Sequence, residues 1–202
     1  MPAPARPYHH GNLREALTEA ALALAREGGG PDAVVIREAS RRVGVSHNAA
    51  YRHFPDRDAL LSAVRARCAE ELAAAMAARL EVVGPQDGTP ERAFQRLEAT
   101  GRAYVGFALA EPGLFRTAFA GKGAPDSGSG PYGLLKAQLD GLLESGALPP
   151  ERRPDAELTA WSAVHGLSEL LLDGPLRELP PPAREAALGH LLATVSRGLT
   201  GR

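Results

Sequence analysis

The sequence predicts an all-α protein of about nine helices, and three observations lead to this class. Ala, Leu, Arg and Glu, which favour helices, dominate the stretches where apolar residues recur every three or four positions. The β-branched and aromatic residues that favour strands are sparse there. Most of the 17 prolines and 22 glycines fall between these stretches, where they would end helices. We expect a small N-terminal helical domain and a larger C-terminal helical bundle.

The first helix is expected to begin near Asn12, after a Pro-rich flexible arm at residues 1–10. Asn12 can cap the helix, and Glu15 completes an approximate capping box. Apolar residues follow at helical spacing, at Leu13, Leu17, Ala20, Ala21 and Leu24. The run Gly28-Gly29-Gly30-Pro31 ends this helix.

Two short helices are predicted next, on either side of a tight joint. The first covers Val35 to Val43, and Gly44 then supplies the turn geometry that few other residues tolerate. The hydroxyl of Ser46 can cap the second, from His47 to His53. Because this helix is too short to be stable alone, its neighbours must hold it.

A fourth, longer helix is expected after Pro55, with Asp56 as its cap. Its apolar stripe runs through Leu60, Leu61, Val64, Cys68 and Leu72 to Leu80. Cys68 is the single cysteine, so the chain can form no internal disulfide, which fits a reducing compartment. Its place on the stripe favours a small buried residue over a redox sensor.

Five more helices are expected in the rest of the chain. Four are long, at residues 91–110, 134–145, 155–172 and 182–198, and one is short, at "GLFRTAFA". The segment "GKGAPDSGSGPYG" (121–133) is predicted to be a flexible loop. No apolar run approaches the ~20 residues of a membrane span, and the N-terminus lacks the apolar core of a signal peptide. The expected location is therefore the cytoplasm, without a membrane partner.

Charge is distributed unevenly along the chain. Residues 1–67 hold 10 Lys and Arg against 7 Asp and Glu, whereas residues 68–202 hold 13 against 17. Four of the six histidines also lie in the front part: His9, His10, His47 and His53. Residues 1–67 are mildly basic and the remainder is acidic. This favours a polyanion as the partner of residues 1–67, although the charge imbalance is small.

A helix, a Gly-containing turn and a second short helix form a helix-turn-helix arrangement. The major groove of DNA, ~12 Å wide, accommodates one helix with its side chains. On the short helix, Ala50 and Phe54 are spaced to pack inward, and the residues expected to point outward are His47, Asn48, Tyr51 and Arg52. Asn can pair with adenine and Arg with guanine, whereas Tyr and His more often meet phosphate.

Two further arginines are expected to contact the DNA backbone. Arg57 begins the fourth helix, where the helix dipole assists phosphate binding, and Arg37 could do the same from the second helix. The expected DNA-binding residues are Arg37, Ser46, His47, Asn48, Tyr51, Arg52, His53 and Arg57. A helical hairpin with a solvated polar face that never binds DNA stays open as an interpretation of this pattern.

The segments "YHHGNLREALTEAALALAREGG" and "IREASRRVGVSHNAAYRHFPDRDALL" together resemble the N-terminal domain of TetR/AcrR-family transcriptional regulators. The resemblance implies a helix-turn-helix DNA-binding domain at residues 11–70 and a ligand-binding and dimerisation domain at 71–202. It also implies a dimer that reads a partly palindromic double-stranded DNA operator. Three residues depart from the family's usual choices: Ser40, Ala50 and Arg57. Ala50 could loosen local packing, whereas Arg57 in place of Lys still suits phosphate.

The C-terminal part carries a shorter resemblance. The runs "AEPGLFRTAF" and "WSAVHGLSELLLDG" resemble a TetR-like branch named for its Trp-His-Gly signature. The candidate pocket residues are Tyr104, Phe107, Phe115, Phe119, Trp161 and His165. A pocket of this kind would suit a mostly apolar effector with one or two polar groups. Alternatively the aromatic residues fill a core, with His165 as a hydrogen-bonded core residue and not a ligand contact or pH sensor.

The last two predicted helices carry apolar stripes that could form a four-helix dimer interface. The stripes are Leu158, Trp161, Val164, Leu167 and Leu171, and then Leu188, Leu191, Leu192 and Val195. The alternative is that both stripes are buried within their own domain. The resemblance favours a homodimer through these helices.

An enzyme is the alternative from another class. The sequence has no Gly-rich phosphate loop, no metal-spaced Cys and His set, and no Gly-x-Ser-x-Gly elbow. His9 and His10 are too few to hold a structural metal, so no metal or cofactor is expected. The sequence predicts a repressor that a small, largely apolar ligand releases from its operator. An activator, or a regulator without an effector, is the alternative, with an enzyme a remote third.

Overall fold

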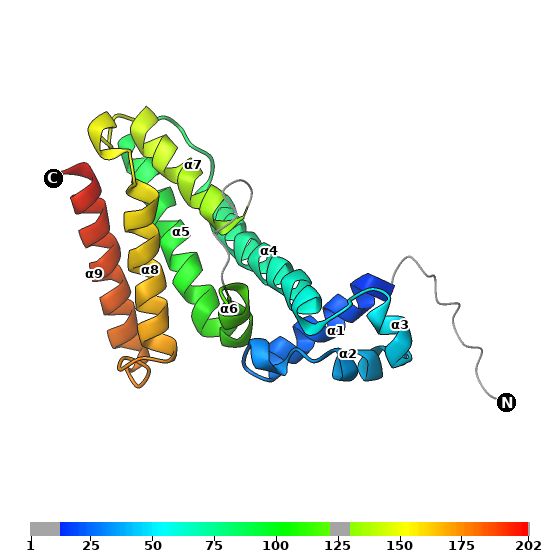
Figure 1. The fold of residues 1–202 in the computed structure, drawn as a ribbon. Helices are drawn as coiled ribbons and strands as arrows, with labels where there is room; N and C mark the ends of the chain where they lie inside the picture. Colours follow the sequence, from blue (N-terminus) through cyan, green and yellow to red (C-terminus); the bar gives the residue numbers. More distant parts are fainter. Residues whose placement is uncertain (1–12, 122–129, 202) are drawn as a thin grey trace. The chain divides into compact units, whose positions relative to one another are not determined.

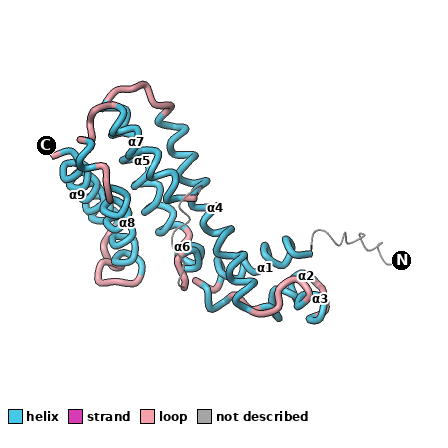
Figure 2. The backbone as a smooth tube through the Cα atoms, turned by 45° about the horizontal axis from the view of Figure 1, so that its top comes forward, coloured by secondary structure: helices cyan, strands magenta, loops and turns pink. Residues whose placement is uncertain are grey.

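A computed structural model describes residues 13–121 and 130–201 of the chain. The expected arm at 1–10, the proposed cap Asn12 and most of the expected loop at 121–133 lie outside these residues. The described part contains nine α-helices and two 3-10 turns, and no strand (Figures 1 and 2). The predicted all-α class is therefore confirmed.

The chain forms two compact units. Among the described residues, the first unit contains 13–68 and 112–121, and the second contains 69–111 and 130–201. The elements of the first unit are α1 (Leu13–Glu27), the 3-10 turn η1 (Pro31–Ala33), α2 (Ile36–Val43), α3 (His47–Tyr51), the start of α4 (Arg57–Val83), and α6 (Pro112–Ala118). Helix α4 continues into the second unit, because the division falls at Cys68.

The joint between α2 and α3 has the predicted geometry. Gly44 adopts a left-handed conformation with φ 76°, and its N–H donates to the carbonyl of Arg41. The Ser46 hydroxyl accepts from the amide of Ala49 at 3.2 Å, and the carboxylate of Asp56 accepts from the amide of Ala59 at 2.7 Å. Both predicted caps are thus confirmed.

Helix α3 is shorter than predicted, because it ends at Tyr51 and not at His53. Pro55 disfavours the helical conformation for the residue before it, so the chain leaves the helix early. The amides of His53 and Phe54 still bond to the carbonyl of Ala50. Ala50 and Phe54 are buried, at 0% and 1% exposed, which confirms that they point inward.

Helix α6 packs within the first unit although it follows α5 in the chain. A Cβ atom on Gly113 would lie 2.3 Å from the carbonyl oxygen of Ala25, so only glycine fits this approach to α1. Arg116 donates to the carbonyl of Gly29 at 3.0 Å. The guanidinium of Arg65, on α4, donates to the carbonyl of Ala120 just after α6. These contacts fasten α6 to the end of α1.

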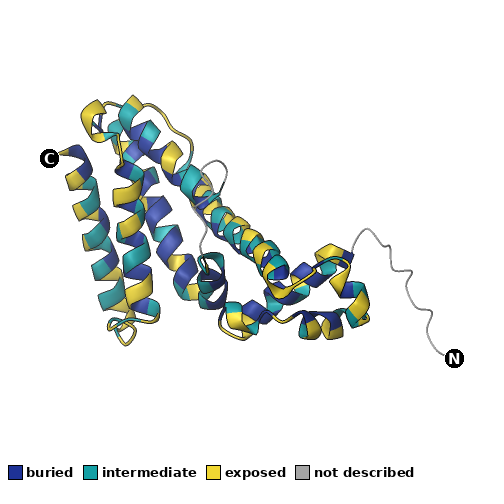
Figure 3. Cartoon of the chain, in the orientation of Figure 1, coloured by how far each residue is buried: buried dark blue, intermediate teal, exposed yellow. Residues whose placement is uncertain are grey.

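The second unit is a helical bundle. It contains the rest of α4, α5 (Pro90–Ala110), α7 (Pro131–Glu144), the 3-10 turn η2 (Pro150–Arg152), α8 (Ala156–Leu172) and α9 (Pro181–Thr200). Helix α5 packs against α7, α8 and α9, and α8 also packs against α7 and α9 (Figure 1). Figure 3 shows buried residues along α5, which supplies much of the core. The core residues include Ala93, Leu97, Leu135, Leu139, Leu142, Leu148, Ala156, Ala160 and Leu199.

None of the helices described is both long enough and apolar enough to cross a membrane.

Candidate DNA-binding face and ligand cavity

Helix α3 and the two residues after it carry most of the side chains that the sequence predicted for DNA contact. Asn48, Tyr51 and Arg52 are exposed, whereas His47 and His53 are half-buried. Neither Asn48 nor Arg52 forms a side-chain hydrogen bond or ion pair with any residue between 13 and 121 or between 130 and 201. Their donors and acceptors therefore remain available to a partner outside the chain.

Two aromatic rings on α3 lie edge to face. The ring centroids of His47 and Tyr51 are 5.1 Å apart with an interplanar angle of 82°, and Tyr51 is 45% exposed. The two residues are one helical turn apart, so they share a face. This contact limits the rotamers of both side chains and places them beside Asn48.

The three arginines of α2 differ in their surroundings. Arg41 donates to Glu38 at 2.9 and 2.5 Å, and Arg42 donates to Glu27 at 2.9 and 2.6 Å. The hydrogen bond from Arg42 lowers the pKa of Glu27. Arg37 is exposed and has no such partner among the described residues. Of the three, Arg37 is therefore the one whose full charge is available to an anion.

Arg57 is engaged by the backbone of its own unit. Its Nε donates to the carbonyl of Val34 at 2.9 Å, and a terminal nitrogen donates to the carbonyl of Pro31 at 2.6 Å. The carboxylate of Asp32 lies 3.7 Å away. The guanidinium that the sequence assigned to a phosphate thus secures the turn before α2. Local sequence pattern carries no signal for this contact, because the partners are 23 and 26 residues away.

Sequence reasoning also missed Arg14. Its guanidinium carbon lies 4.4 Å from the centre of the Phe54 ring, and it donates to the carbonyl of His53 at 2.8 Å. Helix α1 therefore holds the chain just after α3 through a cation–π contact and a hydrogen bond. An arginine on a solvated helix face gives no hint of this role in the sequence.

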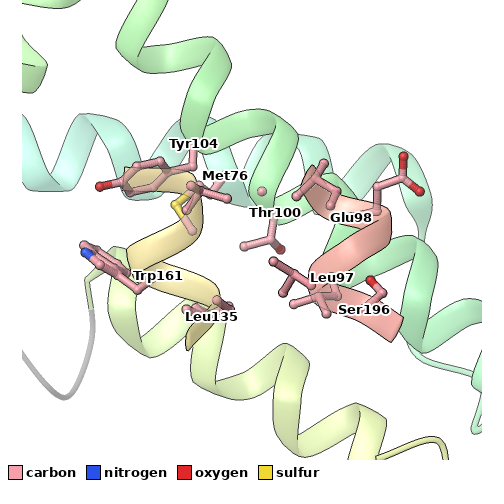
Figure 4. A pocket seen from close by; sticks show the side chains of 13 residues that line it. Met76, Leu97, Glu98, Thr100, Tyr104, Leu135, Trp161 and Ser196 are labelled. Atoms are coloured by element: carbon pink, nitrogen blue, oxygen red, sulfur yellow. The ribbon is translucent and has the colours of Figure 1, made fainter. Parts of the chain in front are cut away.

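The second unit encloses a narrow, largely apolar cavity of about 30 Å³ (Figure 4). Side chains from α4, α5, α7, α8 and α9 line it, and they include Met76, Leu97, Tyr104, Leu135, Trp161 and Leu192. Polar groups at its edge come from Glu98, Thr100 and Ser196. The hydroxyl of Thr100 donates to the carbonyl of Arg96 at 2.9 Å, so it is already satisfied.

The six aromatic and histidine residues predicted for a pocket are not all together. Tyr104 and Trp161 line the cavity, and Phe107 is buried in the same unit without lining it. Phe115 and Phe119 belong to the first unit, where their ring centroids are 5.0 Å apart. They lie there because α6 packs on α1. Sequence reasoning missed the aliphatic lining of the cavity, whose only signal was the apolar stripes.

His165 is hydrogen-bonded inside the second unit. Its Nδ1 lies 2.8 Å from the Tyr104 hydroxyl, and Trp161 meets the Tyr104 ring at a centroid distance of 5.2 Å. Burial raises the pKa of Tyr104. Burial also lowers the pKa of His165, an effect that Glu169 partly opposes. A neutral phenol is therefore hydrogen-bonded to a neutral imidazole, which fits the interpretation of His165 as a core histidine.

Within the described ranges, no group of three or more His, Cys, Asp and Glu side chains is placed to hold a metal ion.

Comparisons with known proteins cover both units. Residues 17–64 match the family model of bacterial regulatory proteins of the tetR family. Residues 97–195 match the model of the tetracyclin repressor-like C-terminal domain. These residues include the run that carries Trp161, His165 and Gly166. No protein with a curated description matches the chain.

Two solved structures are similar over nearly the whole chain. A protein of unknown function from Rhodococcus sp. RHA1 is 30% identical, with 97% of this chain and 100% of that chain covered and a TM-score of 0.72. A TetR variant from Acinetobacter baumannii AYE, solved with minocycline, is 20% identical, with 90% of this chain and 93% of that chain covered and a TM-score of 0.58. The second likeness concerns the fold alone. With its helix-turn-helix unit, its C-terminal helical unit and these matches, the chain belongs to the TetR family of DNA-binding regulatory proteins.

Proposed function

We propose that the protein is a dimeric transcriptional repressor that a small, largely apolar ligand releases from its operator. The observation that carries the DNA-reading part is the unpaired, exposed polar face of α2 and α3, formed by Arg37, Asn48 and Arg52. Asn48 and Arg52 offer the donors and acceptors that read adenine and guanine in the major groove. Arg37 offers a charge to the phosphates.

The dimer is proposed to form through the outer faces of α8 and α9. Most of the apolar stripe predicted for this role is buried within the unit, including Val164, Leu167, Leu171, Leu188 and Leu192. Leu158 is 63% exposed, and Trp161, Leu191 and Val195 are half-buried. The outer faces also present the exposed Leu170, and small residues that allow two helix pairs to approach closely: Ser162 and Gly166 on α8, and Ala186 and Ala193 on α9.

Sedimentation velocity tests the dimer. Ser162→Arg or Ala193→Arg should convert a dimer to a monomer, because each puts an unpaired charge into the proposed interface. Ala74→Arg, an exposed position on α4, is the matched control and should leave the dimer intact. A dimer that survives both interface substitutions would place the interface elsewhere.

The ligand is proposed to enter the cavity beside Tyr104 and Trp161 by widening it. A volume of about 30 Å³ is close to that of a single water, whereas ligand pockets usually measure about 300–1,000 Å³. Met76, with its flexible chain, is a side chain that can move aside. A ligand that binds the widened state more tightly would shift the population toward it and lower operator affinity. The TetR variant solved with minocycline supports the proposal that this fold accommodates a small molecule.

Fluorescence of Trp161 tests the ligand, because it is the only tryptophan and lines the cavity. Apolar compounds would be screened for a change in its emission and then for release of labelled operator DNA. A compound that does both supports a ligand-released repressor. The small cavity favours, as a second candidate, a regulator without an effector, which no compound would release from DNA.

The position of the operator relative to a promoter separates repressor from activator, and a reporter gene with the operator placed upstream or downstream of the promoter measures it. The proposed location is the cytoplasm, where a bacterial regulator meets its DNA. The buried thiol of Cys68, which forms no disulfide, agrees with that location.

A further inference from the structure

A surface hollow of the second unit lies outside the cavity, along the outer side of α5. It measures about 440 Å³, and its walls come from α4, α5, α9 and the end of α8. A second hollow of about 320 Å³ adjoins it, since both are lined by Arg79 and Arg102. We call the two together the α5 furrow. The larger hollow falls within the usual range of small-molecule sites, about 300–1,000 Å³, which the internal cavity does not reach.

The floor of the furrow is apolar. Val105, Leu109, Leu171 and Leu188 line the larger hollow. Gly106 lies among them, and a Cβ atom placed there would meet no atom within 4 Å. Because Gly106 has no side chain, the surface of α5 leaves room here for an apolar ligand chain, to a depth of about one side chain.

The rim of the furrow is positively charged although this part of the sequence is acidic overall. Four arginines line the two hollows, Arg79, Arg92, Arg102 and Arg184, against two acidic residues, Glu98 and Glu185. Both glutamates bind the guanidinium of Arg102. The rim therefore attracts an anion. Its two carboxylates are already paired with Arg102, so it does not attract a cation.

Within the described part of the chain, only the guanidinium of Arg79 among these has no hydrogen-bond or ion-pair partner. Arg184 donates to the carbonyls of Leu179 at 2.6 Å and Arg177 at 2.8 Å. Arg92 pairs with Asp87 at 3.5 Å, and Arg102 is held by its two glutamates. Arg79 is exposed and forms no hydrogen bond or ion pair with a described residue. One unpaired guanidinium matches the two oxygens of one carboxylate.

We propose that the α5 furrow binds an amphipathic monocarboxylate, with the carboxylate on Arg79 and the apolar chain along Val105, Leu109 and Leu188. The complementarity is one of charge at the rim and of apolar surface at the floor. The larger hollow of the furrow is distinct from the internal cavity beside Trp161, since these two share no lining residue; Glu98 alone lines both the cavity and the smaller hollow. The proposal concerns binding alone, so it does not depend on release from an operator.

Calorimetric titration of the full chain with decanoate tests this site, with decanol and decyltrimethylammonium as probes of the head group. Decanoate should bind once per chain and more tightly than the other two. Arg79→Ala should weaken decanoate about tenfold, the effect of one charge-assisted contact, and leave decanol unchanged. Gly106→Leu should abolish binding by filling the furrow. Gly198→Leu, at another helical glycine with open space around it, is the matched control and should bind decanoate normally.

Trp161 emission separates the two sites, because it lines the cavity and not the furrow. Decanoate binding that leaves this emission unchanged supports the furrow. Binding that shifts it, and that persists in Arg79→Ala and Gly106→Leu, would place the ligand in the cavity and overturn the proposal. No binding of decanoate by the folded chain would also overturn the proposal. So would loss of the dimer in Gly106→Leu, because the furrow would then be an interface between copies of the chain.

Discussion

The Nε of Arg57 donates a 2.9 Å hydrogen bond to the carbonyl oxygen of Val34, which joins the start of α4 to the chain two residues before α2. A second bond, from the same guanidinium to Pro31, closes a two-point clamp on the turn that leads into the helix-turn-helix. Through these two bonds the guanidinium ties the start of α4 to the turn before α2. We therefore expect Arg57 to influence DNA binding through the position of α2, whether or not it also contacts a phosphate.

Arg57→Ala should reduce both stability and DNA affinity. We expect a loss of about 1–2 kcal/mol in the free energy of unfolding, because two bonds to a charged donor disappear at a partly exposed site. Arg57→Lys should recover only part of it, since one ammonium cannot match the two-point fork. Urea denaturation measures the effect. Unchanged stability in Arg57→Ala would show that the two hydrogen bonds of Arg57 do not stabilise the folded state.

Arg37→Ala is expected to lower DNA affinity without changing the stability of the fold. Because Arg37 is exposed and unpaired among the described residues, its removal should leave the unfolding transition within about 0.5 kcal/mol. Affinity for all DNA sequences should fall, and the slope of log affinity against log salt should drop by about one. Fluorescence anisotropy over a salt series measures both. A slope that does not change would remove Arg37 from the phosphate contacts.

Asn48→Ala should act on sequence preference and not on salt dependence. If Asn48 reads a base edge, its loss should relax the preference at one position of each half-site by about 1–3 kcal/mol. The salt slope should stay as in the parent chain, because no charge is removed. Competition with single-base operator variants measures this. A uniform loss over all variants would assign Asn48 to the backbone.

Gly113→Ala should destabilise the first unit, because the added methyl group would lie 2.3 Å from the carbonyl oxygen of Ala25. We expect a cost of about 1–3 kcal/mol, typical of overpacking against backbone. Gly198→Ala, with no atom within 4 Å of its Cβ position, should gain up to about 1 kcal/mol from helix propensity. Thermal unfolding of the two variants makes the comparison. Equal stability would mean that α6 does not pack closely on α1.

The pH dependence of stability should carry a contribution from His165. Burial lowers its pKa in the folded chain, so the unfolded chain binds the proton more tightly. This contribution is complete above the ordinary value of 6.5 and is lost as pH falls through that value toward the lowered pKa. His165→Gln should flatten stability over the range from about pH 5 to about pH 8, whereas the exposed His190→Gln should not. An equal pH profile in parent and His165→Gln would contradict the burial.

Much of the fold could be predicted from residue types and their spacing along the sequence. The caps at Ser46 and Asp56 and the left-handed Gly44 follow from residue type and position, and the structure confirms all three. The nine helices follow from apolar spacing and from Gly and Pro breaks, with most ends within one or two residues of prediction. The exceptions are α7, which begins three residues earlier than predicted at Pro131, and α4, which extends to Val83.

Features that depend on distant parts of the chain were not predictable. The target of Arg57 and the contact between Arg14 and Phe54 join residues 23 to 40 positions apart, and no local pattern encodes them. The same holds for Phe115, which α6 carries into the first unit. Periodicity showed that α8 and α9 had apolar stripes, but not that the second unit would cover them. The α5 furrow depends on side chains from four helices, so the sequence alone gave no sign of it.

The central claim is that the chain reads DNA through α3, and selection from a pool of random duplexes tests it most directly. The purified full chain and its Asn48→Ala variant would be put through the same rounds and sequenced. We expect the parent to enrich a partly palindromic sequence with two half-sites, and the variant to lose preference at one symmetric pair of positions. Failure of the parent to enrich any sequence, or identical motifs from both chains, would contradict the assignment of α3 as the reading helix.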